Sequence, residues 1–133
     1  MPAHHVCIQT NDYEASKRFY TQLLDFVLVS ETENFHGRAY NSWLRESGGF
    51  LIELQTPKKD GRFSPYDKES EGLAHLCFVV EDVEKETARL IDAGFEDFRR
   101  KNGSAVYEVL GSRLCKLVAP EGTIIELRDT AEL

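Results

Sequence analysis

The sequence predicts an α+β fold built from two βαβββ modules, and three observations carry this prediction. In each half of the chain, a strand-like stretch, a helical stretch and further strand-like stretches follow one another in the same order. Residues 5–12 and 75–82 echo each other, since each begins with a histidine, has a cysteine two residues later and reaches an aspartate seven residues later. A second echo joins residues 51–54 (Leu-Ile-Glu-Leu) to residues 124–127 (Ile-Ile-Glu-Leu).

The first module is predicted to cover residues 1–56. Residues 4–10 alternate in polarity, which predicts a strand with His5, Cys7 and Gln9 on one face. Asn11-Asp12 is suited to cap a helix, because a short carboxylate accepts hydrogen bonds from the first free backbone N–H groups. The apolar stripe and the β-branched or aromatic stretches that follow predict a helix at 13–24 and strands at 26–30, 39–44 and 50–54.

The second module is predicted to cover residues 73–133. The near-continuous apolar run at 73–80 predicts a strand that is covered on both faces, and Asp82 is suited to cap the helix after it. Residues 104–110 fit either an extra strand or a loop. The polar segment 57–72 is predicted to be the loop that connects the modules. Further strands are expected at 96–100, 113–118 and 123–128.

Composition and charge narrow the classes of function. The 133-residue chain has 41% hydrophobic and 29% charged residues, which is typical of a globular protein. A formal net charge of -7 indicates that the chain does not bind nucleic acid, because phosphate groups require a basic face. No stretch approaches the roughly 20 apolar residues of a membrane span, and no secretory signal is expected. Three cysteines, two of them inside apolar strands, favour a reducing, cytoplasmic setting.

Each half supplies one histidine and one glutamate from strand-like sequence, and these four residues are predicted to bind a metal. His5 precedes Glu53 by 48 positions, and His75 precedes Glu126 by 51 positions. The apolar neighbours of each glutamate are expected to face the opposite side of its strand, and a carboxylate buried alone is costly without a cation. Imidazole and carboxylate ligands together suit one divalent ion of Ni, Co, Zn, Mn or Fe.

Other histidines and cysteines fit the repeat less well. His4 competes with His5, but the seven-residue interval to the following aspartate selects His5. His36 lies in a predicted hairpin and has no partner in the repeat, so it is expected at the surface. Cys7 and Cys77 share strand faces with the predicted histidine ligands. They are interpreted either as soft ligands or redox-sensitive thiols, or as small apolar residues that fill the interior, and the second interpretation is preferred.

The predicted ligands indicate a class of chemistry. A metal acting as a Lewis acid polarises a carbonyl group or stabilises an enediolate, and a nearby carboxylate can move a proton from the adjacent carbon. Such a site suits isomerisation or proton abstraction next to a carbonyl. It suits nucleophilic acyl transfer less well, since the sequence contains no Gly-x-Ser-x-Gly motif.

Taken together, several stretches resemble the vicinal oxygen chelate superfamily, which includes glyoxalase I, methylmalonyl-CoA epimerase, extradiol dioxygenases, fosfomycin-modifying enzymes and bleomycin-resistance proteins. The resemblance is carried by His5-Val-Cys-Ile with Asp12-Tyr-Glu-Ala-Ser-Lys-Arg-Phe-Tyr, Leu51-Ile-Glu-Leu, Gly72-Leu-Ala-His-Leu-Cys-Phe-Val-Val-Glu-Asp and Ala119-Pro-Glu-Gly-Thr-Ile-Ile-Glu-Leu. In that family, paired βαβββ modules curl into an incomplete barrel around a divalent metal. The resemblance implies a homodimer that acts on a small molecule, with the metal ligands His5, Glu53, His75 and Glu126.

The ligand set is similar to that of bacterial glyoxalase I, which implies a lyase or isomerase in which Glu126 or Glu53 transfers the proton. Gln9 stands where glyoxalase I usually has an arginine that helps to hold the glutathione carboxylate. Another thiol, a CoA ester or a different α-hydroxycarbonyl is therefore an alternative substrate. A metal-dependent epimerase or thiol transferase of the same superfamily is an alternative function, as is a binding protein that sequesters a small molecule.

Overall fold

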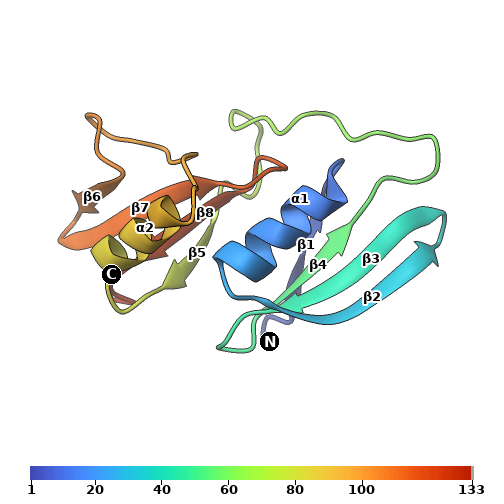
Figure 1. Ribbon diagram of the computed structural model, residues 1–133, viewed down its shortest axis with the longest axis horizontal. Helices are drawn as coiled ribbons and strands as arrows, with labels where there is room; N and C mark the ends of the chain where they lie inside the picture. Colours follow the sequence, from blue (N-terminus) through green and yellow to red (C-terminus); the bar gives the residue numbers. More distant parts are fainter. Residues whose placement is uncertain (133) are drawn as a thin grey trace. The chain divides into compact units, whose positions relative to one another are not determined.

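A computed structural model describes residues 1–132 and divides the chain into two compact units, Met1–Tyr66 and a second unit that begins at Asp67. Each unit contains one four-stranded mixed sheet and one principal helix (Figure 1). This arrangement confirms the predicted α+β class and the two βαβββ modules. Within the described residues, each sheet is open and has two edge strands.

The first unit has the order β-α-β-β-β. Its elements are β1 (His5–Gln9), α1 (Tyr13–Arg18), the π-helical turn η1 (Phe19–Leu23), β2 (Val27–Phe35), β3 (Arg38–Arg45) and β4 (Leu51–Gln55). The strands lie in the order β1-β4-β3-β2, with β1 parallel to β4 and the other pairs antiparallel. The parallel pair places β1, which begins with His5, directly beside β4, which carries Glu53.

The helix predicted at 13–24 is present, although its second half departs from α-helical geometry. The Asp12 carboxylate accepts a hydrogen bond from the backbone N–H of Ala15 at 3.1 Å and so caps α1 as predicted. From Phe19 onward the chain forms η1, in which Phe19 and Tyr20 are buried. An apolar stripe predicts a helix in this segment but does not distinguish a π-helical turn from an α-helical one.

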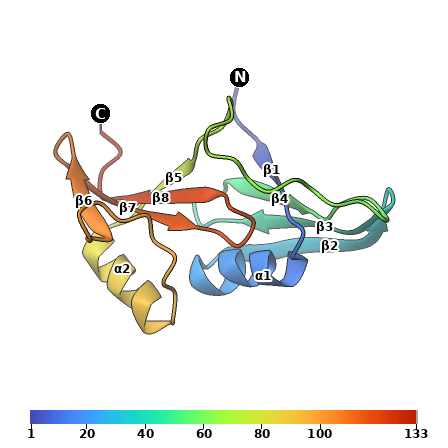
Figure 2. The same cartoon turned by 90° about the horizontal axis from the view of Figure 1, so that it is seen from above.

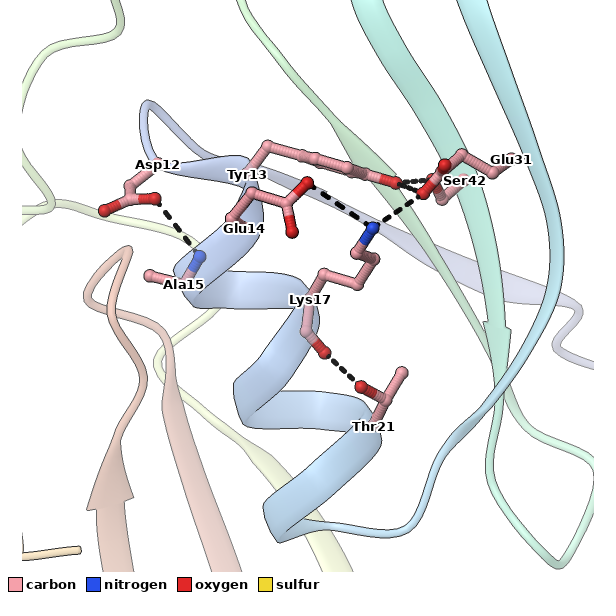
Figure 3. Close-up of polar contacts among 8 residues, drawn as sticks. All are labelled: Asp12, Tyr13, Glu14, Ala15, Lys17, Thr21, Glu31 and Ser42. Carbon is pink, nitrogen blue, oxygen red and sulfur yellow. Dashed lines mark hydrogen bonds and ion pairs between the residues drawn. The ribbon is translucent and has the colours of Figure 1, made fainter.

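A polar cluster fastens α1 to the first sheet (Figure 3). The Tyr13 hydroxyl donates to the Glu31 carboxylate of β2 and lies 2.5 Å from the Ser42 hydroxyl of β3. Lys17 Nζ donates to the same Glu31 carboxylate at 3.0 Å. The hydrogen bond from Tyr13, followed by that from Lys17, lowers the pKa of Glu31. One buried aromatic side chain thus connects the helix to two strands.

The second unit repeats the order of the first. Its elements are β5 (Leu76–Val79), α2 (Val83–Asp92), β6 (Val106–Val109), β7 (Ser112–Val118) and β8 (Ile124–Arg128). The strands lie in the order β5-β8-β7-β6, and β5 runs parallel to β8. The Asp82 carboxylate accepts a hydrogen bond from the backbone N–H of Lys85 at 3.0 Å, which caps α2 as predicted.

Two predictions for the second unit were wrong. Residues 96–100 are not a strand, because Phe98 forms only an isolated bridge to Leu117. Phe98 is the single apolar side chain in this polar stretch, which leaves no apolar face to bury. The remaining strand of the module is β6, inside the segment 104–110 that fitted either a strand or a loop. The strand predicted at 73–80 is shorter and is not covered on both faces, since Cys77 and Val79 are exposed on an edge strand.

Each helix lies against one face of its own sheet (Figure 2), and alternation along the strands separates an apolar face from a polar one. In β4, Ile52 and Leu54 are fully buried, while Glu53 between them points to the other face. In β8, Ile125 and Leu127 are buried on either side of Glu126. Both glutamates therefore belong to the face opposite their apolar neighbours. No helix within residues 1–132 is long and apolar enough to cross a membrane.

Candidate metal centre

The first predicted ligand pair, His5 and Glu53, lies on the polar face of the first sheet. Cys7 stands opposite Glu53 in the parallel pairing of β1 with β4, and His5 is two residues before Cys7 on the same face. His5 Nε2 is 3.6 Å from Glu53 Oε2, and the two side chains are 36% and 16% exposed. The fold thus brings together two residues that are far apart in the sequence.

Neutral groups surround this first pair. The Gln55 side chain donates from Nε2 to Glu53 Oε1 at 3.1 Å. Trp43 stands opposite Glu53 in the β3–β4 hairpin, and its ring lies edge-on to the His5 ring with centroids 4.8 Å apart. Among the described residues, no lysine or arginine forms an ion pair with Glu53. A bound cation would therefore supply positive charge directly at this carboxylate.

The two other histidines lie at exposed positions. His4 is exposed, with Nδ1 at 2.8 Å from His5 Nδ1. His36 is in the turn between β2 and β3 at φ 46°, and its ring lies edge-on to Phe35 with centroids 4.5 Å apart. The hairpin predicted around His36 is therefore present.

His75 and Glu126 form the equivalent pair in the second unit. Cys77 stands opposite Glu126 in the parallel pairing of β5 with β8, just as Cys7 stands opposite Glu53. His75 Nε2 is 3.6 Å from Glu126 Oε2, and the Glu126 side chain is only 8% exposed. The nitrogen–oxygen separation equals that of the first pair, so the repeat preserves the geometry as well as the residue types.

Lys116 is a charged neighbour of this second pair that the sequence analysis did not single out. It stands opposite Glu126 in the β7–β8 hairpin, and its Nζ is 3.5 Å from Glu126 Oε2, the oxygen that also faces His75. The sequence does contain a signal for it: a hairpin with its turn centred on Glu121 places residue 116 opposite residue 126. Lys116 supplies the charge compensation that a buried carboxylate requires.

Cys7 and Cys77 lie on the same faces as the two histidines, and both are exposed. Desolvation of the sulfur, together with the carboxylate of Glu53 or Glu126, raises the pKa of each thiol to about 11. Cys77 Sγ lies 3.4 Å from Glu126 Oε1 and donates to it. Thiols with this pKa are protonated at neutral pH and do not act as thiolates. Their exposure also differs from that of small residues that fill an interior.

The donor atoms and their separations suit a divalent ion. Two ligands bound at about 2.0–2.2 Å, with angles from octahedral to somewhat wider than tetrahedral, have donor atoms about 3.0–3.6 Å apart. Both His–Glu pairs lie at the upper end of this interval, at 3.6 Å. Within residues 1–132, there is no cluster of three or more His, Cys, Asp or Glu that could hold an ion. The binding of all four residues to one ion stays a prediction.

Comparison with known proteins identifies the family. A family model for the glyoxalase/bleomycin resistance protein/dioxygenase superfamily matches residues 4–107. The chain belongs to this superfamily. The matched range contains His5, Glu53 and His75, whereas Glu126 lies beyond it. The family resemblance predicted from the sequence motifs is thereby confirmed.

Two uncharacterized bacterial proteins are similar to about two thirds of the chain. The uncharacterized protein YwkD of Bacillus subtilis is 34% identical over 97 residues, which cover 70% of this chain and 72% of YwkD. The uncharacterized protein YaeR of Escherichia coli is 36% identical over 94 residues, which cover 65% of this chain and 67% of YaeR. The descriptions of these two relatives give no reaction.

Solved structures of the superfamily share the fold. A glyoxalase family protein from Enterococcus faecalis has a TM-score of 0.75 and 26% identity, covering 96% of this chain and 97% of its own. Glyoxalase I from Zea mays, in a variant form, has a TM-score of 0.75 and 20% identity over 96% of this chain and 44% of its own. The fosfomycin resistance protein FosX of Listeria monocytogenes, in complex with Mn(II) and sulfate, has a TM-score of 0.70 and 12% identity over 98% and 93%. Members of this superfamily thus include metal-binding proteins.

Proposed function

We propose that this chain is a divalent-metal-dependent lyase or isomerase of the glyoxalase I type, acting on a hemithioacetal or another α-hydroxycarbonyl. The observation that carries the proposal is the duplicated His–Glu pair, which occupies equivalent strand positions with the same 3.6 Å separation. An ion held by four protein donors would still have room for substrate oxygens if it took six ligands. Membership of a superfamily that includes the Mn(II)-binding FosX supports a metal-dependent activity.

In the proposed site, His5, Glu53, His75 and Glu126 hold the ion, which supplies Lewis acidity toward the carbonyl oxygen when bound. The chain itself performs the proton transfer. One carboxylate, Glu126 or Glu53, removes the proton from the carbon next to the carbonyl and returns it to the neighbouring carbon. The enediolate formed between these two steps carries the electron pair left by the first proton. A second proton passes from the hydroxyl oxygen to the former carbonyl oxygen, so the hydroxyl and carbonyl positions are exchanged without an external oxidant.

The groups beside each glutamate suit this role because they orient the carboxylates. Gln55 binds Oε1 of Glu53 and leaves Oε2 directed at His5. Cys77 binds Oε1 of Glu126, while Lys116 and His75 both face Oε2. Proton transfer and metal binding both depend on a fixed carboxylate, and hydrogen bonds from neighbouring side chains are the usual means of fixing one.

Metal analysis of the purified protein, paired with a turnover assay on methylglyoxal and a thiol, tests the proposal. We expect near-stoichiometric metal, loss of turnover on chelation and recovery with Ni or Co. Stoichiometric metal without turnover would redirect the search to other carbonyl substrates while retaining the metal site. Absence of metal under conditions that permit loading would contradict the proposal and favour a binding protein. Glu33→Gln, which changes an exposed carboxylate of β2, is the matched control for substitutions of Glu53 and Glu126 in the same assay.

A further inference from the structure

A strip of uncharged hydrogen-bonding side chains crosses the first sheet beside the His5–Glu53 pair. The strand registers place Gln9 opposite Gln55, Gln55 opposite Asn41, and Asn41 opposite Thr32. Residues that stand directly opposite each other point to the same face, with Cβ atoms about 4.5–5.5 Å apart. These four side chains, called here the amide row, share the face of Glu53. Gln55 is two residues beyond Glu53, so the row begins about 7 Å along β4.

One member of the amide row has an unused acceptor. Asn41 is 3% exposed, and its Oδ1 has no hydrogen-bond partner among the described residues. Buried carbonyl groups without a donor are rare in folded proteins, because they have lost water without replacing it. The neighbouring Gln55 amide is already engaged, since its Nε2 donates to Glu53 Oε1. The row therefore holds a buried acceptor next to the candidate metal ligand.

The charges around the amide row favour an uncharged ligand. The four side chains carry no charge. The nearest side chain on the same face of β4 is the Glu53 carboxylate, which is negatively charged when ionised. Arg38 belongs to the alternate set of β3 side chains, and it donates from Nη1 to the backbone carbonyl of Thr56 at 2.7 Å. Arg38 acts electrostatically on Cys7, but its guanidinium is held by the Thr56 carbonyl. A carboxylate entering the row would stand next to the Glu53 carboxylate, and no member of the row is a cation. A hydroxyl or carboxamide can donate to one amide oxygen and accept from another amide nitrogen.

We propose that the amide row is a binding subsite for an uncharged hydroxyl or carboxamide group of the substrate. The inference rests on the proposed function for the position of the reacting carbons, which lie at the neighbouring His–Glu pair. It narrows the substrate class to a thiol adduct or α-hydroxycarbonyl that presents an uncharged polar tail on this side. Asn41 supplies the buried acceptor, Gln9 supplies an amide that donates and accepts, and Gln55 supplies its carbonyl oxygen as a further acceptor.

Binding of two inert probes to the full chain, with and without Zn, tests the subsite. S-methyl-N-acetylcysteamine carries a carboxamide, and 3-(methylthio)propionate carries a carboxylate on a chain of similar length. Neither probe is a hemithioacetal or an α-hydroxycarbonyl, so neither is turned over by the proposed reaction. Proton–nitrogen correlation spectra follow the side-chain amide signals of Asn41, Gln55 and Gln9, assigned from single substitutions to leucine. The titrations give a dissociation constant for each probe.

We expect the carboxamide probe to shift the Asn41 and Gln55 side-chain signals and to bind at least about threefold more tightly than the carboxylate probe. Asn41→Leu should weaken the carboxamide probe by roughly threefold to tenfold, the size of one lost hydrogen bond. Gln9→Arg, at an exposed strand position, should reverse the preference between the probes. Glu33→Gln, on the alternate set of β2 side chains, should leave both constants unchanged.

Equal affinities for the two probes, no saturable binding of the carboxamide probe, or an unchanged preference in Gln9→Arg would overturn the subsite. Gln9→Arg carries this test alone if Asn41→Leu does not fold. Because the probes are not turned over, a lack of enzymatic activity would count against the proposed function only. Tighter binding of the carboxylate at the row, in a protein that turns over hemithioacetals, would count against the subsite only.

Discussion

The two His–Glu pairs share one backbone arrangement but differ in the residue that faces the glutamate across the hairpin. Trp43 stands opposite Glu53, whereas Lys116 stands opposite Glu126. The more deeply buried carboxylate, Glu126 at 8% side-chain exposure, is the one with a lysine at 3.5 Å. Glu53, at 16% exposure, is hydrogen-bonded by the neutral Gln55 amide instead. The more buried glutamate is thus the one with a cationic neighbour. A bound metal ion would therefore stabilise the charge of Glu53 more than that of Glu126.

The helices of the two units differ in a related way. In the first unit, α1 is joined to the sheet by the polar cluster of Tyr13, Lys17, Glu31 and Ser42 (Figure 3). In the second, α2 packs through apolar side chains such as Val83 and Leu90, which are 2% and 0% exposed. Buried apolar side chains pack both helical segments, and the polar contacts between helix and sheet differ: Tyr13 and Lys17 reach Glu31 in the first unit, whereas Arg113 donates to Glu84 in the second.

The largest expected effect is the loss of turnover when one of the two glutamates is replaced by glutamine. Glu126→Gln should lower methylglyoxal–thiol turnover by at least about 100-fold, because it removes a proposed base and ligand at constant volume. Stability should change by no more than about 1 kcal/mol, since Lys116 is partly exposed and can turn toward solvent. Steady-state kinetics and urea unfolding measure the two quantities. Full activity in this variant would show that Glu126 is not the base, and the same assay on Glu53→Gln would then identify it.

An intermediate effect is expected from breaking the Lys116–Glu126 contact. Lys116→Met should destabilise the metal-free protein by about 1–2 kcal/mol, because it leaves a buried carboxylate without its cation. Saturation with Zn should remove most of this difference, since the ion compensates the same charge. Urea unfolding with and without Zn measures it. Trp43→Met, the equivalent position beside Glu53, is the matched comparison and should show no such dependence on metal. An equal loss in Lys116→Met with and without Zn would contradict this account of the pair.

The smallest expected effect concerns pH and the α1 cluster. The Tyr13 and Lys17 hydrogen bonds lower the pKa of Glu31 below its ordinary value of 4.5. The stability that this carboxylate contributes is therefore complete above about pH 4.5 and is lost as the pH falls through the lower folded-state pKa. The difference in unfolding free energy between the wild-type protein and Glu31→Gln should be largest near pH 7 and shrink below pH 4.5. A constant difference across this range, or an equal response in Glu33→Gln, would count against the cluster.

The sequence predicted those features that rest on local chemistry or on the repeat. Asp12 and Asp82 cap their helices as expected, because each carboxylate needs only the backbone N–H three residues later. The alternation in β1 and β4 placed His5, Cys7 and Glu53 on one face. Features set by pairing between strands were harder to predict. The strand expected around Phe98 is reduced to one isolated bridge to Leu117, and Lys116 gains its role from the hairpin register.

The metal content of His5→Ala and His75→Ala, each loaded and dialysed beside the wild-type protein, tests the central claim most directly. If both pairs bind the same ion, the wild-type protein should hold about one divalent ion per chain, and each single variant should lose nearly all of it. Each variant removes one ligand of the same site, although the two histidines come from different halves of the chain. Retention of full metal content in both variants, or of half in each, would contradict a single site built from the two His–Glu pairs.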